Sequence, residues 1–181
     1  MKTLKYLTYF FFGILLFSSC SPQLSPFTER LQDEFDWSEN ELQQIQFYTS
    51  KDIVLQRDFS SGESTITGGK IRVINGREVE EVVIRRGTPG VLMFTPKENR
   101  FAVSFEEGDE KYLMFGPNPK AGGKFVLLAK DWRRNTGKVS YDGRIYNTPS
   151  SSAYANLMVD LKKLRKLSVK SRKAKGRTVG R

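Results

Sequence analysis

The residue types that carry most enzyme chemistry are scarce in this sequence. Its 181 residues contain no histidine and a single cysteine, Cys20. Histidine is the commonest general base and the commonest metal ligand, and it activates the nucleophile in Ser–His and Cys–His sites. A single cysteine also rules out a zinc cluster of several thiolates within the chain. We therefore expect a protein that is not an enzyme and that needs no cofactor.

Carboxylates offer the main remaining route to catalysis. Two facing carboxylates can hydrolyse a glycosidic bond, and the candidates are Asp58, Glu106, Asp109, Asp131 and Asp142. Most of these acids lie beside turn glycines or basic residues, where solubility explains them. The sequence has no Asp-x-Asp-x-Asp calcium loop. Weak carboxylate-based hydrolysis therefore stays an alternative, and we expect no metal site.

The segment Gly116–Lys124 resembles a phosphate-binding loop only superficially. It reads Gly-Pro-Asn-Pro-Lys-Ala-Gly-Gly-Lys and lacks the Gly-Lys-Ser/Thr ending, because Phe125 follows Lys124. Strands are predicted on both sides of the segment, so we expect a long hairpin loop. Loops on rigid sheets often carry recognition, which keeps this one a candidate binding loop.

Two further stretches are candidate recognition loops, Arg85–Gly90 and Trp132–Asn135. Trp132 beside two arginines could stack on a sugar or an aromatic group, although a tryptophan that closes one end of a barrel fits the same pattern. The candidate recognition residues are Arg85, Arg86, Asn118, Lys120, Trp132, Arg133 and Arg134.

The first 19 residues have the features of a secretory signal. Lys2 and Lys5 precede a twelve-residue apolar run, Tyr6 to Phe17, which small serines follow. As a helix, this run would span about 18 Å at about 1.5 Å per residue, well short of a hydrocarbon core about 30 Å thick. We therefore expect a cleaved leader instead of a permanent transmembrane helix.

Phe17-Ser18-Ser19-Cys20 resembles the lipobox of bacterial lipoprotein precursors, with Phe17 at the position where leucine is usual. In that family a diacylglycerol is attached to the cysteine thiol, the leader is cut just before it, and the new amino terminus is acylated. The resemblance implies lipidation of Cys20, and several acyl chains hold a protein on a membrane almost permanently. Ser21 stands where Asp would favour the inner membrane, which implies the periplasmic face of the outer membrane.

Basic residues are concentrated at the C-terminal end. The whole chain carries a net charge of +10, and loss of Lys2 and Lys5 with the leader leaves +8. Residues 20–161 carry −2, whereas the segment after Leu161 has ten bases and no acid. The candidate anion-binding or partner-binding residues in this segment are Lys162, Lys163, Arg165, Lys166, Lys170, Arg172, Lys173, Lys175 and Arg177.

The compartment decides which polyanion these bases meet. Export argues against nucleic acid, and no aromatic residue that could stack on bases follows Tyr154. An exported lipoprotein meets anionic lipid headgroups, lipopolysaccharide phosphates, peptidoglycan carboxylates and acidic protein surfaces. Near an anionic membrane each base contributes about 1 kcal/mol, so several bases would supply a useful second attachment. A solvated tail that only aids solubility explains the same composition.

From residue 52 onward, short runs rich in Val, Ile, Phe and Tyr alternate with Gly, Asn, Asp and Pro. This texture predicts strands, and Asn75-Gly76 and Asp142-Gly143 predict two-residue hairpins. Pro96–Asn99 and Glu107–Glu110 predict two further turns. The predicted strands cover residues 52–59, 64–74, 77–86, 90–95, 100–106, 111–115, 124–129, 137–141 and 144–147.

Two short helices are predicted before the strands. Phe27, Leu31 and Phe35 recur every four residues, which suits an amphipathic helix. Ser38 followed by Glu41 forms a capping box at the start of a second helix. We expect both to pack on the main body. Residues 150–169 fit a helical face and an alternating strand equally well, so their type stays open.

The sequence therefore predicts one mainly β domain, a small antiparallel barrel or sandwich with one or two short N-terminal helices and a basic C-terminal segment. The expected parts are a signal peptide at 1–19, the acylated cysteine and a tether at 20–28, the β-rich domain at 29–161 and the basic segment at 162–181.

The expected function is a non-enzymatic binding or assembly module, anchored by acyl chains on the periplasmic face of the outer membrane. Its basic end would contact an anionic envelope component or a protein partner. Two alternatives stay open: a glycan- or lipid-directed binding module, and a structural spacer without a specific ligand. An apolar interior large enough for an acyl chain would favour lipid binding, whereas a packed core would leave only the surface for function.

Overall fold

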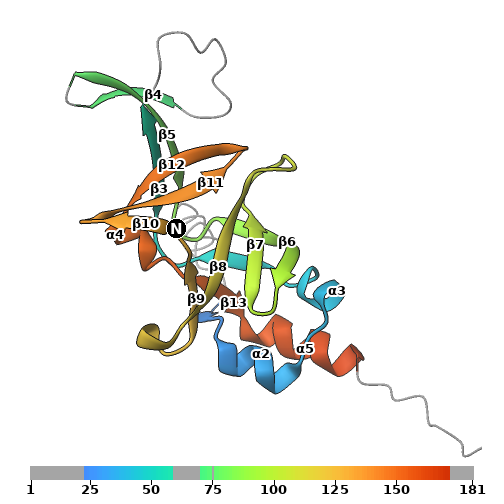
Figure 1. The fold of residues 1–181 in the computed structure, drawn as a ribbon. Coiled ribbons are helices and arrows are strands. Elements are labelled where there is room, and N and C mark those ends of the chain that lie inside the picture. The colour runs from blue at the N-terminus through green and yellow to red at the C-terminus, as the bar shows by residue number, and fades with distance from the viewer. Residues whose placement is uncertain (1–22, 59–69, 75, 172–181) are drawn as a thin grey trace, which may run out of the picture.

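The structure of the protein is a computed structural model that describes residues 23–58, 70–74 and 76–171. Two antiparallel sheets dominate it in a sandwich-like arrangement (Figure 1). The mainly β prediction is therefore confirmed. The strands do not form a closed barrel within the described part of the chain, so the sandwich alternative is the better description.

The first sheet has seven strands. In spatial order they are β1 (Leu24–Pro26), β13 (Leu157–Asp160), β2 (Phe47–Thr49), β6 (Pro89–Lys97), β7 (Arg100–Ser104), β8 (Tyr112–Asn118) and β9 (Lys124–Leu127). Its two edges approach each other, because the Phe125 amide donates to the carbonyl of Phe27 at 3.1 Å and the Leu127 amide to that of Ala155 at 2.9 Å. The sheet is therefore strongly curled.

The second sheet has six strands. In spatial order they are β10 (Lys130–Arg133), β11 (Thr136–Tyr141), β12 (Arg144–Pro149), β3 (Ile53–Asp58), β5 (Arg77–Ile84) and β4 (Lys70–Ile74). The hairpin predicted at Asp142-Gly143 is confirmed, since Asp142 has φ 52° and Gly143 φ 67° and both are left-handed. The Asn75-Gly76 hairpin is confirmed by the pairing of Ile74 with Arg77.

Short helices occupy the ends of the strands. They are α2 (Glu29–Phe35), α3 (Glu39–Leu42), the 3₁₀ turn η1 (Pro119–Ala121), α4 (Ser150–Ala153) and α5 (Leu161–Ser171). Both predicted N-terminal helices are present, and the capping box is confirmed by the Ser38 amide, which donates to the Glu41 carboxylate at 3.0 Å. Leu31 and Phe35 of α2 pack against the core, as predicted.

The interior of the curled sheet is filled with aromatic side chains. Phe27 is fully buried, and its ring contacts those of Phe47, Phe101, Phe125 and Trp37 at centroid distances of 5.0–6.0 Å. Edge-to-face and tilted contacts of this kind stabilise a core beyond the area that they bury. The interior of the curled sheet is therefore a packed core, and of the two outcomes expected from the sequence this is the one that leaves the surface for function.

Two sequence predictions need correction. Residues 24–28 are predicted to belong to the tether, but β1 pairs with β13 and Phe27 is central to the core, so they belong to the domain. The strands β1, β2 and β10 are not predicted, because three or four residues are too few for a period to show. In residues 150–171, where the sequence leaves helix and strand open, both occur in succession, the strand β13 followed directly by the helix α5.

Candidate functional site

Helix α5 carries the described part of the basic segment, and Asp160 fixes where it begins. Asp160 is the last residue of β13, and its Oδ1 accepts hydrogen bonds from the amides of Lys162 at 2.9 Å and Lys163 at 3.3 Å. An aspartate in this position satisfies amides that lack a partner in the first helical turn. The chain therefore changes from strand to helix within one residue.

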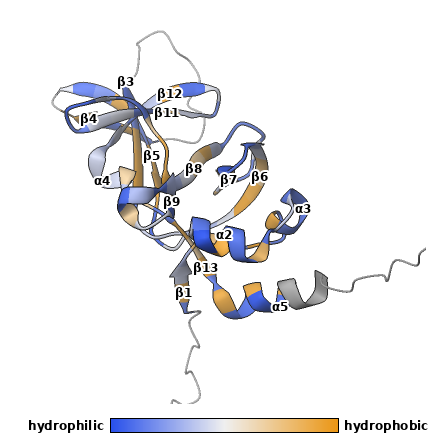
Figure 2. Cartoon of the chain, turned by 60° about the horizontal axis from the view of Figure 1, so that its bottom comes forward, coloured by the Kyte–Doolittle hydropathy of each residue, from blue (hydrophilic) through white to orange (hydrophobic). Residues whose placement is uncertain are grey.

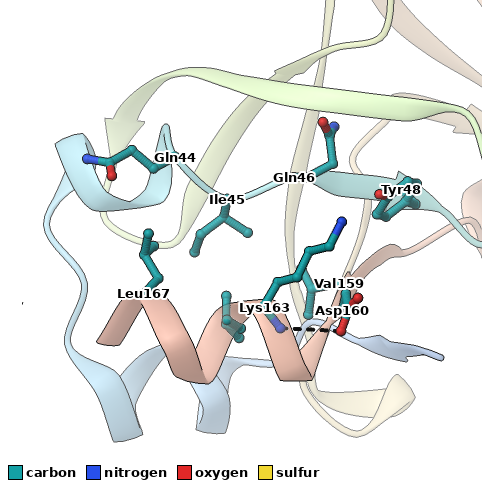
Figure 3. Close-up of a pocket in the computed structure, with 9 residues that line it drawn as sticks. Gln44, Ile45, Gln46, Tyr48, Val159, Asp160, Lys163 and Leu167 are labelled. Atoms are coloured by element: carbon teal, nitrogen blue, oxygen red, sulfur yellow. Dashed lines mark hydrogen bonds between the residues drawn. The ribbon is translucent and has the colours of Figure 1, made fainter. Parts of the chain in front are cut away.

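One side of α5 is used by the domain itself. Leu164 is 3% exposed, and Leu161 and Leu167 pack against the core, as their spacing of three residues allows. Figure 3 shows Leu167 and Ile45 between α5 and the segment that leads into β2. The cavity at this contact, about 160 Å³, is small, so α5 is held firmly by its apolar side.

The rest of the surface of α5 is basic. Lys162, Lys163, Arg165 and Lys166 are all exposed, and none forms an ion pair with another residue of the described segments. Lys163 extends across the small cavity toward β2, with its carbon stem against the body (Figure 3). We call these four residues the basic face of α5. Since the apolar side is covered by the domain, the basic face is what α5 offers to a partner.

The rest of the predicted basic segment is only partly placed. Lys170 lies on α5, whereas Arg172, Lys173, Lys175 and Arg177 lie outside the described residues. Cys20, the predicted lipidation site, also lies outside them.

The pairing of β1 with β13 brings the start of α5 next to the N-terminal end of the domain. Leu24 is the register partner of Asp160, and paired Cα atoms in antiparallel strands lie about 5 Å apart. Four residues separate Cys20 from Leu24, and an extended chain of that length spans at most about 14 Å. The first turn of α5 is thus within about 20 Å of residue 20, whatever path the intervening residues take. Figure 2 shows β1 and α5 at the same end of the molecule.

The three predicted recognition loops pack against different parts of the domain. The Arg86 amide donates to Asp52 Oδ1 at 2.7 Å, which ties the exposed Arg85 and Arg86 to the segment before β3. The Asn118 side chain accepts from the Lys120 amide at 3.0 Å and caps η1. This tip lies against α2, since the Glu29 amide donates to the carbonyl of Gly123 at 2.9 Å.

The third loop lies on the edge strand β10. Trp132 is 43% exposed, and its ring lies on Gly137, where a Cβ would approach the indole to 2.9 Å. Arg133 and Arg134 are exposed, and Arg134 has φ 53°. Packing of the indole on a neighbouring strand accounts for Trp132 without a ligand. The predicted hairpin is confirmed because β8 pairs with β9, but its loop is shorter than expected: Gly116, Pro117 and Asn118 are paired residues of β8, and only residues 119–123 form the loop.

Of the candidate acids, Glu106 and Asp109 share the segment between β7 and β8, and the Asp142 amide donates to the carbonyl of Glu110 in that segment at 2.9 Å, whereas Asp58 ends β3 and Asp131 lies on β10. Glu106 Oε1 accepts a hydrogen bond from the buried hydroxyl of Tyr141 and lies 3.5 Å from Lys111, so this oxygen has structural partners. Asp58, Asp109 and Asp131 are exposed, and Asp142 occupies the β11–β12 turn. In the described ranges no three His, Cys, Asp or Glu side chains gather as a metal site would need, and no helix there is long and apolar enough to cross a membrane.

Sequence reasoning missed Asp160 and the β1–β13 pair, which together position the basic face. A signal for the first existed, since an aspartate directly before the Leu161, Leu164 and Leu167 spacing is a helix start. The pairing had no local signal, because it joins residues 132–136 positions apart. No protein-family model matches the chain, and the comparisons with characterised proteins and with solved structures find no match either.

Proposed function

We propose that the protein is a lipid-anchored envelope protein that acts as a non-enzymatic binding or assembly module. Its acyl chains on Cys20 would hold it on the periplasmic face of the outer membrane, and the basic face of α5 would contact anionic lipid headgroups of the same membrane. The observation that carries the proposal is the pairing of Leu24 with Asp160, which keeps α5 close to the anchored end.

The charge distribution supports this orientation. The anchor limits how far residue 24 can move from the bilayer, and the first turn of α5 moves with it. Four exposed bases near an anionic surface contribute about 1 kcal/mol each. Residues 20–161 carry −2, so without α5 the domain would be weakly repelled by the same surface. The anchor and the helix would then act together, since a tethered second contact benefits from a high effective concentration.

The test measures vesicle binding without the acyl anchor. Residues 20–181 with Cys20→Ser are mixed with phosphatidylcholine vesicles that contain or lack phosphatidylglycerol, and bound protein is sedimented. We expect binding that requires the anionic lipid and falls steeply with added salt. A variant with Lys162, Lys163, Arg165 and Lys166 all replaced by Glu should bind about a thousandfold more weakly, which corresponds to about 4 kcal/mol.

The matched control places the same charge change elsewhere. Arg85, Arg86, Arg133 and Arg134 are exposed, and their replacement by Glu gives the same net charge as the α5 variant. Binding should stay within a few-fold of the unaltered chain. Equal loss in both variants would show that only net charge matters and would contradict the proposal, as would binding to vesicles that is independent of phosphatidylglycerol.

A further inference from the structure

A long groove lies on the opposite side of the curled sheet from its core. It forms where β6, β7 and β8 meet β10, β11 and β12, and it has a volume of about 630 Å³. Small-molecule sites in proteins occupy about 300–1,000 Å³. The groove is separate from α5 and from the candidate recognition residues, none of which lines it.

The walls of the groove are apolar although they face outward. Tyr112 and Met114 line it and alternate along β8 with buried Leu113 and Phe115. Phe94 is 36% exposed and contacts the Tyr112 ring edge-on at 5.1 Å, and Ile145 opposite is 59% exposed. The described chain thus leaves a continuous strip of apolar side chains in contact with solvent. Such patches mark binding sites on soluble domains.

Four basic residues line the groove. Lys97, Arg100, Lys130 and Lys138 do so together with a single acid, Asp131. None of these four bases forms an ion pair with another described residue. Residues 20–161 carry a net charge of −2, so the groove is more positive than the domain as a whole.

A glycine holds one of these bases at the groove. A Cβ at Gly116 would lie 2.2 Å from Nη1 of Arg100 and 3.1 Å from Leu128. Nη1 of the guanidinium therefore lies over the backbone of β8 at Gly116, beside the apolar wall, and a side chain at residue 116 would displace it. This places a planar donor where the headgroup of an amphiphile would sit.

We propose that the groove binds an anionic membrane lipid, with an acyl chain along the apolar walls and the charged headgroup at Lys97, Arg100, Lys130 and Lys138. An uncharged ligand would give the four bases no charged partner, and an acidic peptide would leave the apolar side chains of the groove exposed to solvent. A lipid satisfies both halves of the surface. No residue of α5 lines the groove, so this proposal can be tested separately from the membrane contact proposed above.

The test uses calorimetric titration of residues 20–181 with Cys20→Ser, which keep every residue of both sheets. The probe is laurate below its critical micelle concentration. We expect saturable binding of one laurate per chain. Dodecyltrimethylammonium, which has the same chain length and the opposite charge, and acetate, which has the headgroup alone, should each bind at least about tenfold more weakly. Equal binding of the cation would reduce the groove to an apolar patch and overturn the proposal.

Variants locate the site. Ile145→Asp should weaken laurate binding at least about tenfold, whereas Val73→Asp, at an even more exposed apolar residue outside the groove, should not. Lys130→Glu with Lys138→Glu should have a similar effect, and Arg85→Glu with Arg86→Glu should have none. These side chains are exposed, so folding is preserved and is checked by circular dichroism. Unchanged binding in both groove variants, or equal loss in their controls, would overturn the proposal.

Gly116→Ala provides a second check on the position of the headgroup. The added methyl displaces Arg100 and leaves the apolar walls in place. The preference for laurate over dodecyltrimethylammonium should therefore fall by at least about threefold. An unchanged preference would show that Arg100 does not contact the headgroup and would contradict the placement of the ligand.

Discussion

The interiors of the two sheets differ in kind. Within the seven-stranded sheet, Phe27, Phe47, Phe101 and Phe125 are at most 1% exposed and pack ring against ring. That interior is apolar, and it lies at the end of the molecule that carries β1, β13 and α5.

The six-stranded sheet contributes apolar side chains to the same core, such as Ile53 and Leu55, but it also buries charge on its inner face. Glu80 is fully buried and accepts from Arg57, with Nη2 at 2.7 Å and Nε at 2.9 Å, while Arg144 lies at 3.7 Å. The Arg57 guanidinium also lies over the ring of buried Tyr146, 5.9 Å from its centroid. Burial, more than the neighbouring Glu80, raises the pKa of Tyr146.

The two sheets therefore have different roles in the molecule. The aromatic interior fixes the strands that position the N-terminal end of the domain and the basic face of α5. The polar interior lies in the sheet whose β4–β5 hairpin projects at the opposite end (Figures 1 and 2). Buried ion pairs contribute little net stability. We infer that the apolar core, which is most aromatic in the seven-stranded sheet, provides most of the stability and that the six-stranded sheet depends in addition on matched charges.

The largest expected effect is on the aromatic interior. Phe27→Ala removes a ring that four other aromatic side chains contact, and it should lower the free energy of unfolding by about 3–5 kcal/mol. Urea denaturation followed by circular dichroism measures the loss. Phe94→Ala is the control, since its ring is 36% exposed, and a loss as large there would contradict the comparison.

Breaking the buried charge cluster should cost about 3 kcal/mol. Glu80→Gln keeps the shape but leaves Arg57 and Arg144 without their carboxylate. The double variant Arg57→Met with Glu80→Met removes the principal pair and should be more stable than Glu80→Gln. If the double variant is the less stable of the two by urea denaturation, the cluster is a net source of stability and our inference is wrong.

Tyr141→Phe should cost about 2 kcal/mol, because the buried hydroxyl donates to the Glu106 carboxylate. Burial, and then this hydrogen bond, raise the pKa of Tyr141. In the unfolded chain tyrosine ionises near pH 10, whereas in the fold it stays neutral, so stability should decline as pH rises above about 10. The decline should be smaller in Tyr141→Phe, as thermal unfolding at alkaline pH would measure.

A smaller effect is expected at the other end of the pH range. A hydrogen bond from Gln56, and then the charge and hydrogen bond of Arg72, lower the pKa of Glu81. Stability from this carboxylate is present above its unfolded pKa and is lost as pH falls through the folded value. Since Arg72 is 62% exposed, the loss should be below about 1 kcal/mol. Glu81→Gln should flatten this part of the stability–pH curve, and an unchanged curve would contradict the assignment.

The sequence predicted much of the fold because its signals are local. Nearly every strand between residues 70 and 149 follows from alternation between turns, and the Asp142-Gly143 turn has the expected backbone. The curl of the first sheet could not be predicted, because Phe27 meets Phe125 across almost one hundred residues. The apolar groove was hidden for the same reason, since Phe94, Tyr112 and Ile145 come from three separate strands.

The composition predicted the basic residues of α5, but it did not predict how the fold positions them. Lysine and arginine density identified residues 162–166, whereas the contact of Leu164 with the core and the pairing of Leu24 with Asp160 depend on the fold. The lipidation of Cys20 and the envelope location stay predictions from the leader sequence.

The most direct test of the central claim compares the distance of the two ends from the bilayer. If Cys20 is acylated, a cysteine introduced at Arg165 on α5 or at Arg77 at the start of β5 is the only free thiol. Acylated protein carrying a fluorophore at either thiol is placed in phosphatidylglycerol vesicles whose headgroups carry a quencher. We predict strong quenching of a fluorophore at residue 165 and little quenching of one at residue 77. Equal quenching at both, the reverse order, or labelling of the unaltered chain at Cys20 would contradict it.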